Sequence, residues 1–192
     1  MTSQPGDLDA IQGDGQLHYP VFGTTEDLVI GLFRPYFARL RDAGGPDVRV
    51  YTNYEEGMVM PCVLALNTRR TGIDAYAVKD EFYVRSTVLE VNTLASGRNA
   101  EKDAADLQEA IRHVFMDAHR RQVVIPNVGS LSSVSSSVMA TRQTDWASSS
   151  GPTQYAKLPH SATRYEARYR ILIRPPATYD NQFLTPFNGE NY

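Results

Sequence analysis

The stretch RYEARYRILIR, residues 164–174, decides the fold of this chain. Its odd positions are apolar or aromatic, and five of its six even positions are charged. A period of two over this length is typical of a strand with one buried face, because a helix would scatter the arginines around its circumference. The stretch therefore predicts a long β-strand whose charged face meets solvent or an acidic partner.

A helix at 100–118 is the best candidate to cover the apolar face of that strand. Its apolar residues recur at spacings of three and four, and they are Ala100, Ala104, Leu107, Ile111, Val114, Phe115 and Ala118. Another helix is expected to begin at Thr24 or Thr25 and to end at the turn 43–46. Pro35 lies inside this second helix and is expected to kink it or to split it in two.

The remaining patterns predict strands. A short strand is expected at 48–52, an apolar one at 61–66, a long one at 81–94, and one at 134–143 that pairs with 164–174 across the connection 144–162. We therefore predict an α/β (α+β) fold, in which a mixed or antiparallel sheet carries helices on one face.

The chain divides into a domain and two arms. Residues 24–174 form the predicted domain, 1–23 an extended N-terminal arm, and 175–192 an extended C-terminal arm with aromatic anchors. A solvated tail normally lacks so many aromatic residues. We expect a neighbouring subunit to hold the arms; the alternative is that they fold back on their own domain.

Composition excludes several classes of protein. The 192 residues carry a formal net charge of −3, whereas general nucleic-acid binders carry a basic excess. The one cysteine, Cys62, lies in an apolar run and is predicted to be a small buried thiol. The sequence contains neither a membrane-spanning apolar stretch nor a signal peptide, so we expect synthesis in a cytoplasm and no membrane partner.

The sequence offers no catalytic motif. His113 and His119 lie six apart on the predicted helix, near opposite faces, and cannot chelate a metal together. The chain contains no G-x-S-x-G, P-loop, G-x-G-x-x-G or C-x-x-C pattern. We therefore expect no enzymatic activity, and no catalytic, metal-binding or cofactor-binding residues.

Three segments, taken in order, resemble a known family. They are PCVLALNTRRTG at 61–72, VLEVNTLASGRNAEKDAAD at 88–106, and LP at 158–159 with RYEARYRILIR at 164–174. Their order and spacing resemble the tail terminator (tail-completion) proteins of long-tailed bacteriophages, especially those of actinobacterial phages. The resemblance covers about residues 24–174. It departs from the usual pattern at His160, where an aromatic residue is usual, and at Gly72, where Gly-Gly is usual.

The resemblance implies a structural virion protein without cofactors. Such a protein forms a ring homo-oligomer, a hexamer, that caps the tail tube, ends elongation and joins the tail to a head-completion or neck protein. It is assembled in the host bacterial cytoplasm and resides at the tail–neck junction of the virion. If the basic face of 164–174 lines the lumen of the ring, we expect genomic DNA to pass through without specific binding.

Two alternatives stay open. One is a head-completion or neck protein of the same virion, acting as a stopper or connector. The other is a small cytoplasmic enzyme or ligand-binding α/β domain, which a deep pocket with convergent polar groups would favour.

Clustered arginines and isolated aromatics suggest interface positions. The arginines of 164–174 predict a local positive field facing a ring lumen or a neighbouring subunit; the alternative is a solvated face offset by Glu166 and Glu90. A turn at 67–72 suits contacts to the next subunit or the tube. A tryptophan in the long connection suits a docking anchor, or a local cover. The candidate interface residues are Arg69, Arg70, Trp146, Arg164, Arg168, Arg170, Arg174, Tyr179, Phe183 and Phe187.

Overall fold

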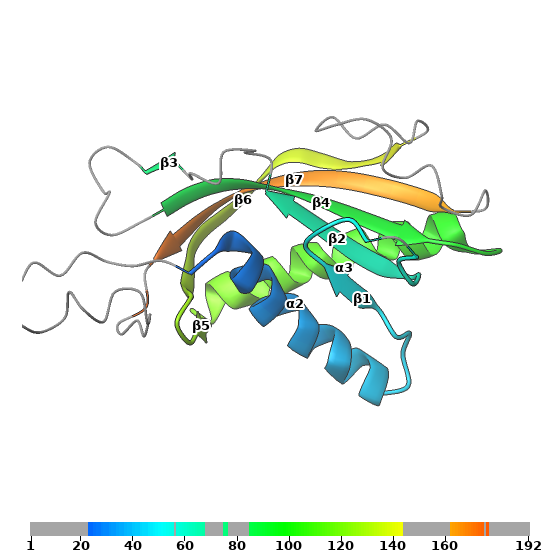
Figure 1. Cartoon of the computed structure of the whole chain (residues 1–192), viewed down its shortest axis with the longest axis horizontal. Helices are drawn as coiled ribbons and strands as arrows, with labels where there is room; N and C mark the ends of the chain where they lie inside the picture. The colour runs from blue at the N-terminus through cyan, green and yellow to red at the C-terminus, as the bar shows by residue number, and fades with distance from the viewer. Residues whose placement is uncertain are drawn as a thin grey trace, which may run out of the picture.

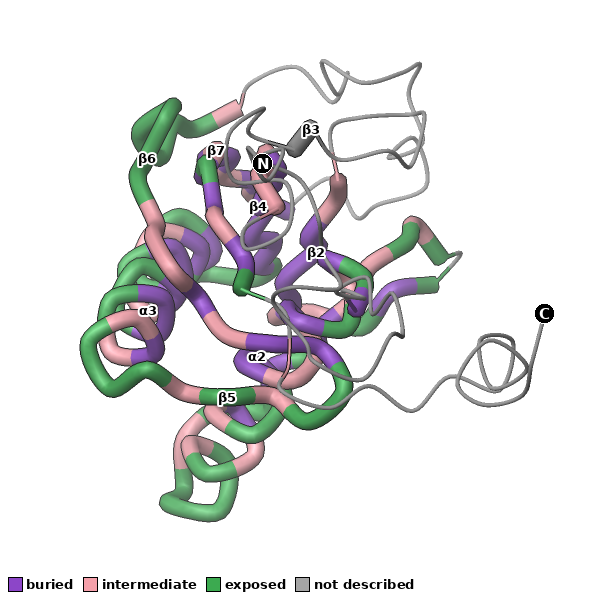
Figure 2. Tube along the Cα trace, turned by 90° about the vertical axis from the view of Figure 1, so that its left-hand side faces the viewer, coloured by how far each residue is buried: buried purple, intermediate pink, exposed green. Residues whose placement is uncertain are grey.

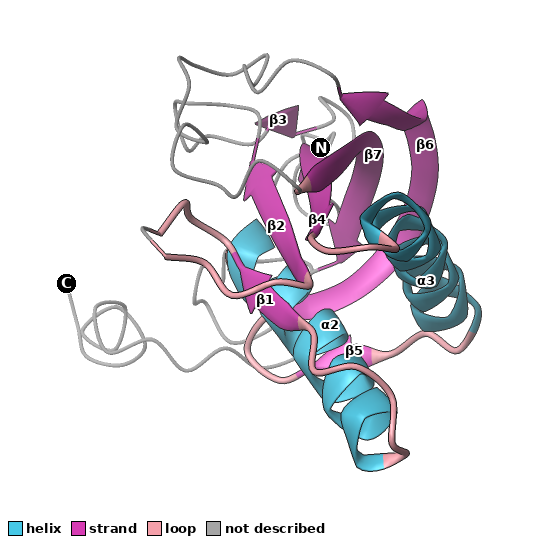
Figure 3. Ribbon diagram, turned by 90° about the vertical axis from the view of Figure 1, so that its right-hand side faces the viewer, coloured by secondary structure: helices cyan, strands magenta, loops and turns pink. Residues whose placement is uncertain are grey.

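The computed structural model describes residues 23–55, 57–67, 75–76, 85–143, 162–174 and 176. Within these residues the chain forms a curled sheet with two helices on one face (Figure 1, Figure 3). The predicted mixed α/β fold is confirmed. The predicted arms lie outside the described residues, except for Gly23 and Pro176.

The described residues form seven strands of one sheet, in the order β1, β2, β4, β7, β6, β5, and β3 pairs with the beginning of β4. β1 runs parallel to β2, and every other pairing is antiparallel. The strand bounds are Arg49–Tyr51 (β1), Cys62–Asn67 (β2), Ala75–Tyr76 (β3), Arg85–Ala95 (β4), Val124–Ile125 (β5), Gly129–Gln143 (β6) and Thr163–Arg174 (β7).

β7 lies in the interior of the sheet, between β4 and β6, and confirms the strand predicted at 164–174. From Ala167 onward its odd-numbered side chains enter the main core, where Ile171 and Ile173 are fully buried. The register with β4 places Leu89 opposite Tyr169. The two strands therefore present a shared apolar surface to the helices.

Helix α3 (Ala100–Arg120) covers this apolar surface, as predicted from its helical stripe. All seven residues of the predicted stripe are buried. Its opposite side carries ion pairs between neighbouring turns, including Arg112 with Glu109 at 2.6 Å. Such surface pairs contribute little to stability, so burial of the apolar stripe is what holds α3 on the sheet.

Buried hydrogen bonds also fix the position of α3. The Gln108 side-chain amide donates to the main-chain carbonyls of Val91, at 2.9 Å, and Tyr165, at 3.1 Å. The Thr93 hydroxyl donates to the Ala104 carbonyl at 2.7 Å. Because these partners lie on β4, β7 and α3, the helix is bonded directly to both interior strands.

Helix α2 (Thr25–Asp42) packs beside α3 against the same face of the sheet. Thr24 is its N-cap: the Asp27 amide donates to the Thr24 hydroxyl at 3.0 Å, and the capping box is complete. Ala43 is the C-cap, and Gly44 follows with φ +86°, a conformation that favours glycine. The predicted start and end of the helix are confirmed.

Pro35 does not split α2, which is continuous from Thr25 to Asp42, so the expected division into two helices is wrong. Its ring removes one main-chain hydrogen bond, but Pro35 lies on the exposed side of the helix. Leu32, Phe33 and Phe37 on the other side are buried in the main core. Tertiary packing supplies most of the stability of a helix in a protein, and here it keeps the two halves continuous.

β6 pairs with β7 as predicted, although it begins at Gly129, five residues before the expected start at Val134. The pairing runs from Ser130 opposite Arg174 to Gln143 opposite Arg164 and contains three register shifts. Such bulges increase the local bend and twist of a strand. The predicted connection 144–162 lies outside the described residues, apart from Ala162.

Candidate functional site

Four predicted interface residues lie on the described part of the chain, and all of them are on β7: Arg164, Arg168, Arg170 and Arg174. The others lie outside the described residues, and they are Arg69, Arg70, Trp146, Tyr179, Phe183 and Phe187. The structure therefore tests only the charged face of β7.

The face of the sheet opposite the helices carries a charged network, defined here as Glu90, Asn92, Arg164, Glu166 and Arg168. Arg164 Nη1 donates to Asn92 Oδ1 at 3.2 Å, and Asn92 Nδ2 donates to Glu90 Oε1 at 3.0 Å. Arg168 Nη2 lies 3.4 Å from Glu90 Oε2 and 3.0 Å from Glu166 Oε1. Arg164 Nη1 also lies 3.7 Å from Glu166 Oε2. The network joins β4 to β7 and balances its two arginines with two glutamates.

Strand register produces this network. Glu90 lies opposite Arg168, and Asn92 lies opposite Glu166. Directly opposed side chains on one face have Cβ atoms close enough to interact, and opposite charges stabilise the pairing. Arg164 lies opposite Leu94 and reaches diagonally to Asn92.

The arginines in the first half of β7 present little positive charge to solvent. Arg164 is fully buried, and only 30% of the Arg168 side chain is exposed. The alternative, in which Glu166 and Glu90 offset the arginines, is confirmed for Arg168. Arg170 and Arg174 are exposed, so only the second half of β7 presents positive charge to solvent.

An apolar cluster lies on the same face, beside the charged network. It consists of Met58, Cys62, Leu64 and Leu94. Cys62 is fully buried, which confirms the predicted buried thiol. Desolvation raises the pKa of the Cys62 thiol to about 12, from an ordinary value of 9.0.

The native protein is expected to protect Cys62 from a chromogenic disulfide reagent at pH 8, and denaturation is expected to expose one reactive thiol. The folded state retains the thiol proton at a pH where the unfolded chain releases it. The stability that the folded state gains by keeping the Cys62 thiol protonated is therefore complete below pH 9. It decreases as the pH rises toward about 12. Equal labelling rates with and without denaturant would contradict the buried assignment.

β6 presents the most exposed surface of the sheet. Residues 135–142 are all exposed, and Met139 retains 82% and Val138 41% of its accessible surface. Figure 2 shows this part of β6 exposed while β4 and β7 are mostly buried. Among the described strands, only β5 pairs with the outer edge of β6, at Gly129 and Ser130. No other described strand pairs with the rest of that edge, where Val138 and Met139 are exposed.

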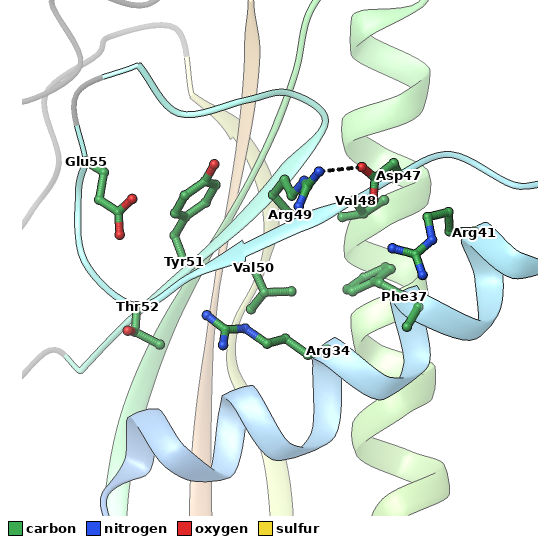
Figure 4. A pocket seen from close by; sticks show the side chains of 11 residues that line it. Arg34, Phe37, Arg41, Asp47, Val48, Arg49, Val50, Tyr51, Thr52 and Glu55 are labelled. Carbon is green, nitrogen blue, oxygen red and sulfur yellow. Dashed lines mark ion pairs between the residues drawn. The ribbon is translucent and has the colours of Figure 1, made fainter.

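A hollow at the other end of the sheet, here called the β1 pocket, lies between α2 and the edge strand β1 (Figure 4). Its volume is about 420 Å³, and Phe37, Val48 and Val50 form its apolar part. Three arginines line it: Arg34, Arg41 and Arg49. The sequence analysis did not predict this pocket. Its arginines lie on α2 and β1, and local sequence patterns do not show that these two elements pack together. The one local signal was the seven-residue spacing of Arg34 and Arg41, which places both on the same side of the predicted helix, two turns apart.

A second hollow, the helix groove, lies between α2 and α3 and has a volume of about 550 Å³. Gly31, Leu32, Tyr36, Val114 and Val123 contribute to its apolar lining. Its polar residues are Arg39, His113, Asp117 and Arg121. His113 Nε2 lies 3.1 Å from Glu109 Oε1, and Arg121 pairs with Asp117 at 3.2 Å, so at least two of these polar groups have partners on α3 itself.

No group of metal-ligating side chains occurs within the described ranges. No described helix is long and apolar enough to cross a membrane. The features that remain are surfaces: the exposed half of β6, the β1 pocket and the helix groove. Both hollows are partly open to solvent among the described residues.

Comparison with known proteins adds no relative: no protein-family model matches this sequence, and no curated protein matches it either.

Proposed function

We propose that this chain is a structural virion protein that caps the tail tube of a long-tailed phage as a hexameric ring. The observation that carries the proposal is the arrangement of the three segments that resemble tail terminators. They contribute β2, the passage from β4 into α3, and β7. β2, β4 and β7 are neighbouring strands, and α3 packs on β4 and β7. Segments separated in the sequence thus make one contiguous unit, as expected if they belong to one ancestral fold.

The two ends of the sheet support ring formation because they differ. β1 and the β1 pocket lie at one end, and the exposed half of β6 lies at the other. A ring that closes head to tail needs two different surfaces on every subunit. Val138 and Met139 give the β6 end apolar contact area, which a monomer gains little by exposing.

The function would be steric. Binding to the end of a tail tube covers the surface to which the next tube ring would add, and it offers a new surface to a head-completion protein. Arg170 and Arg174 are exposed on β7 and are the candidates for a weakly basic lumen through which DNA passes. A chemical step plays no part in this mechanism.

The mass of the purified protein, measured across a concentration series with and without tail tubes, tests the proposal. We expect either a six-fold ring in solution or a monomer that becomes a ring on tube ends. A chain that stays monomeric at every concentration and does not bind tail tubes would contradict the proposal. A ring that ignores tubes but binds the neck would favour the head-completion function.

Paired variants sharpen this measurement. Met139→Arg is expected to weaken ring formation, because it places a charge in the contact surface of β6. Met116→Arg is the matched control, since Met116 is also exposed, at 49%, but lies on α3. Equal behaviour of the two variants would show that the β6 end is not the ring contact.

A further inference from the structure

The exposed half of β6, residues 135–142, carries the most exposed large apolar side chain among the described residues. This side chain is Met139, at 82%, and Val138 beside it is 41% exposed. Residues 130–141 contain no charged residue, and three register shifts bend the strand. Bulges of this kind disfavour the addition of another strand. The exposed half of β6 is therefore suited to contact through its apolar side chains.

The helix groove offers apolar surface that these side chains can cover. Its lining is the more apolar of the two hollows. Arg121 in this lining already pairs with Asp117 at 3.2 Å, and His113 lies 3.1 Å from Glu109. An uncharged occupant leaves both pairs intact, so it adds apolar burial without separating them.

The β1 pocket fits the same occupant less well. Arg34 and Glu55 line it, and neither forms an ion pair with a described residue. Figure 4 shows the Arg34 side chain below Val50, within the hollow. Covering these two groups with uncharged side chains removes water from them and supplies no partner. The helix groove is therefore the better acceptor for the exposed half of β6.

The exposed half of β6 and the helix groove lie at different ends of α3. Arg142 on β6 pairs with Glu101, in the first turn of α3, at 3.0 Å. On α3 the groove is lined from His113 onward, which is about 18 Å further along the helix axis. Figure 1 shows the yellow end of β6 and the β5 end of the helices on opposite sides of the domain. Both surfaces belong to regular elements of one packed domain, so contact between them requires a second copy.

Charge at the two surfaces is complementary. Glu101 lies beside the exposed half of β6, and its side chain is 59% exposed although it pairs with Arg142. Arg39 lines the helix groove, is exposed, and forms no ion pair with any described residue. An ionised carboxylate has acceptor sites for more than one arginine. Glu101 of one copy can therefore pair with Arg39 of another.

We propose that Val138 and Met139 of one copy insert into the helix groove of the next copy, with Glu101 of the first facing Arg39 of the second. This inference rests on the self-association in the proposed function, and it identifies both surfaces of the ring contact. The sheet edge of each subunit meets the helix layer of its neighbour. Since donor and acceptor are different surfaces, repeating the contact joins subunits head to tail, as a closed ring requires.

Cysteine cross-linking in the full-length chain, with and without tail tubes, tests the contact. Met139→Cys places a thiol on β6, and Val123→Cys places one in the lining of the groove. Oxidation of this double variant is expected to give covalently linked oligomers on a non-reducing gel. Met139→Cys with Met116→Cys is the matched control, because Met116 is exposed on α3 but does not line the groove. We expect it to link at least about tenfold less, since its thiols are not held together.

Three outcomes of the cross-linking would overturn the inference. One is equal linkage in the two double variants. Another is the absence of linked oligomers from the Met139→Cys, Val123→Cys variant. The third is linkage of the Met139→Cys single variant to itself, which would show that two β6 strands meet each other. The parent chain gives the background, because Cys62 is fully buried.

Charge reversal provides the second measurement. Arg39→Glu is expected to reduce linkage of the double variant about tenfold, because it replaces an ion pair by a repulsion. Adding Glu101→Arg together with Arg142→Glu should restore linkage, since this exchange keeps the pair within the subunit and reverses the charge that faces the groove. Arg34→Glu is the matched control: Arg34 is also exposed on α2 but lines the β1 pocket. An equal loss from both reversals, or no restoration, would contradict the pairing.

The two proposals fail in different ways. Six-fold rings that cap tail tubes without linkage between β6 and the groove would remove this contact and leave the proposed function intact. Linked oligomers that do not bind tail tubes would retain the contact and remove the tube-capping function.

Discussion

Replacing Arg164 with methionine is expected to lower the free energy of unfolding by about 3–5 kcal/mol, the usual cost of removing one partner from a buried ionic network. Arg164 is fully buried. Its guanidinium donates a hydrogen bond to the Asn92 side-chain oxygen and lies near the Glu166 carboxylate. The methionine variant leaves the Asn92 oxygen and the Glu166 carboxylate without that guanidinium. Chemical denaturation, followed by circular dichroism, measures the loss.

Arg170→Met is the matched control for this prediction. Arg170 lies on the same strand and the same face, but it is exposed. Its replacement is expected to change stability by no more than about 0.5 kcal/mol. Similar losses from the two variants would show that the network does not stabilise the fold. A double variant, Arg164→Met with Glu166→Leu, should recover part of the loss, because it removes both charges together.

Replacing Phe115 with alanine is expected to cost about 3–5 kcal/mol of stability, the range for large aromatic residues in a packed core. The Phe115 ring is 1% exposed. Its centroid lies 5.1 Å from that of Phe33 on α2 and 5.0 Å from that of Tyr169 on β7. One ring therefore joins both helices to the sheet, and its removal leaves a cavity where the three elements meet.

Met116→Ala separates the effect of core packing from that of helix propensity. Met116 is the next residue on α3, and it is about half exposed. Its replacement is expected to change stability by no more than about 0.5 kcal/mol, as is usual for surface substitutions. The midpoint of urea unfolding should shift for Phe115→Ala with an unchanged slope. Equal shifts in the two variants would contradict the packing described here.

The charged network around Arg164 and the ring contacts of Phe115 lie on opposite faces of the sheet. Phe115 acts on the helix-covered face of the sheet, and Arg164 acts on the opposite face. Both depend on the interior pair of strands, β4 and β7.

Local patterns were enough to predict the main elements. The alternation in β7 and the stripe in α3 describe which side of each element is apolar, and each element buries that side. The capping residue Thr24 and the glycine after Ala43 fixed the ends of α2 for the same reason, since they act on adjacent main-chain groups.

Long-range packing decided what the sequence pattern left open. The alternation placed Arg164 and Arg170 on one face, and only the cross-strand register and the burial of that face separate the fully buried residue from the exposed one. The continuity of α2 through Pro35 depends on a core built from distant strands.

The β1 pocket likewise exists because α2 packs beside a short edge strand. The sequence by itself thus determined the period and polarity of each element, which are local properties. The tertiary structure alone decided which charges are buried together and which remain at the surface, because burial and pairing depend on residues far apart in the chain.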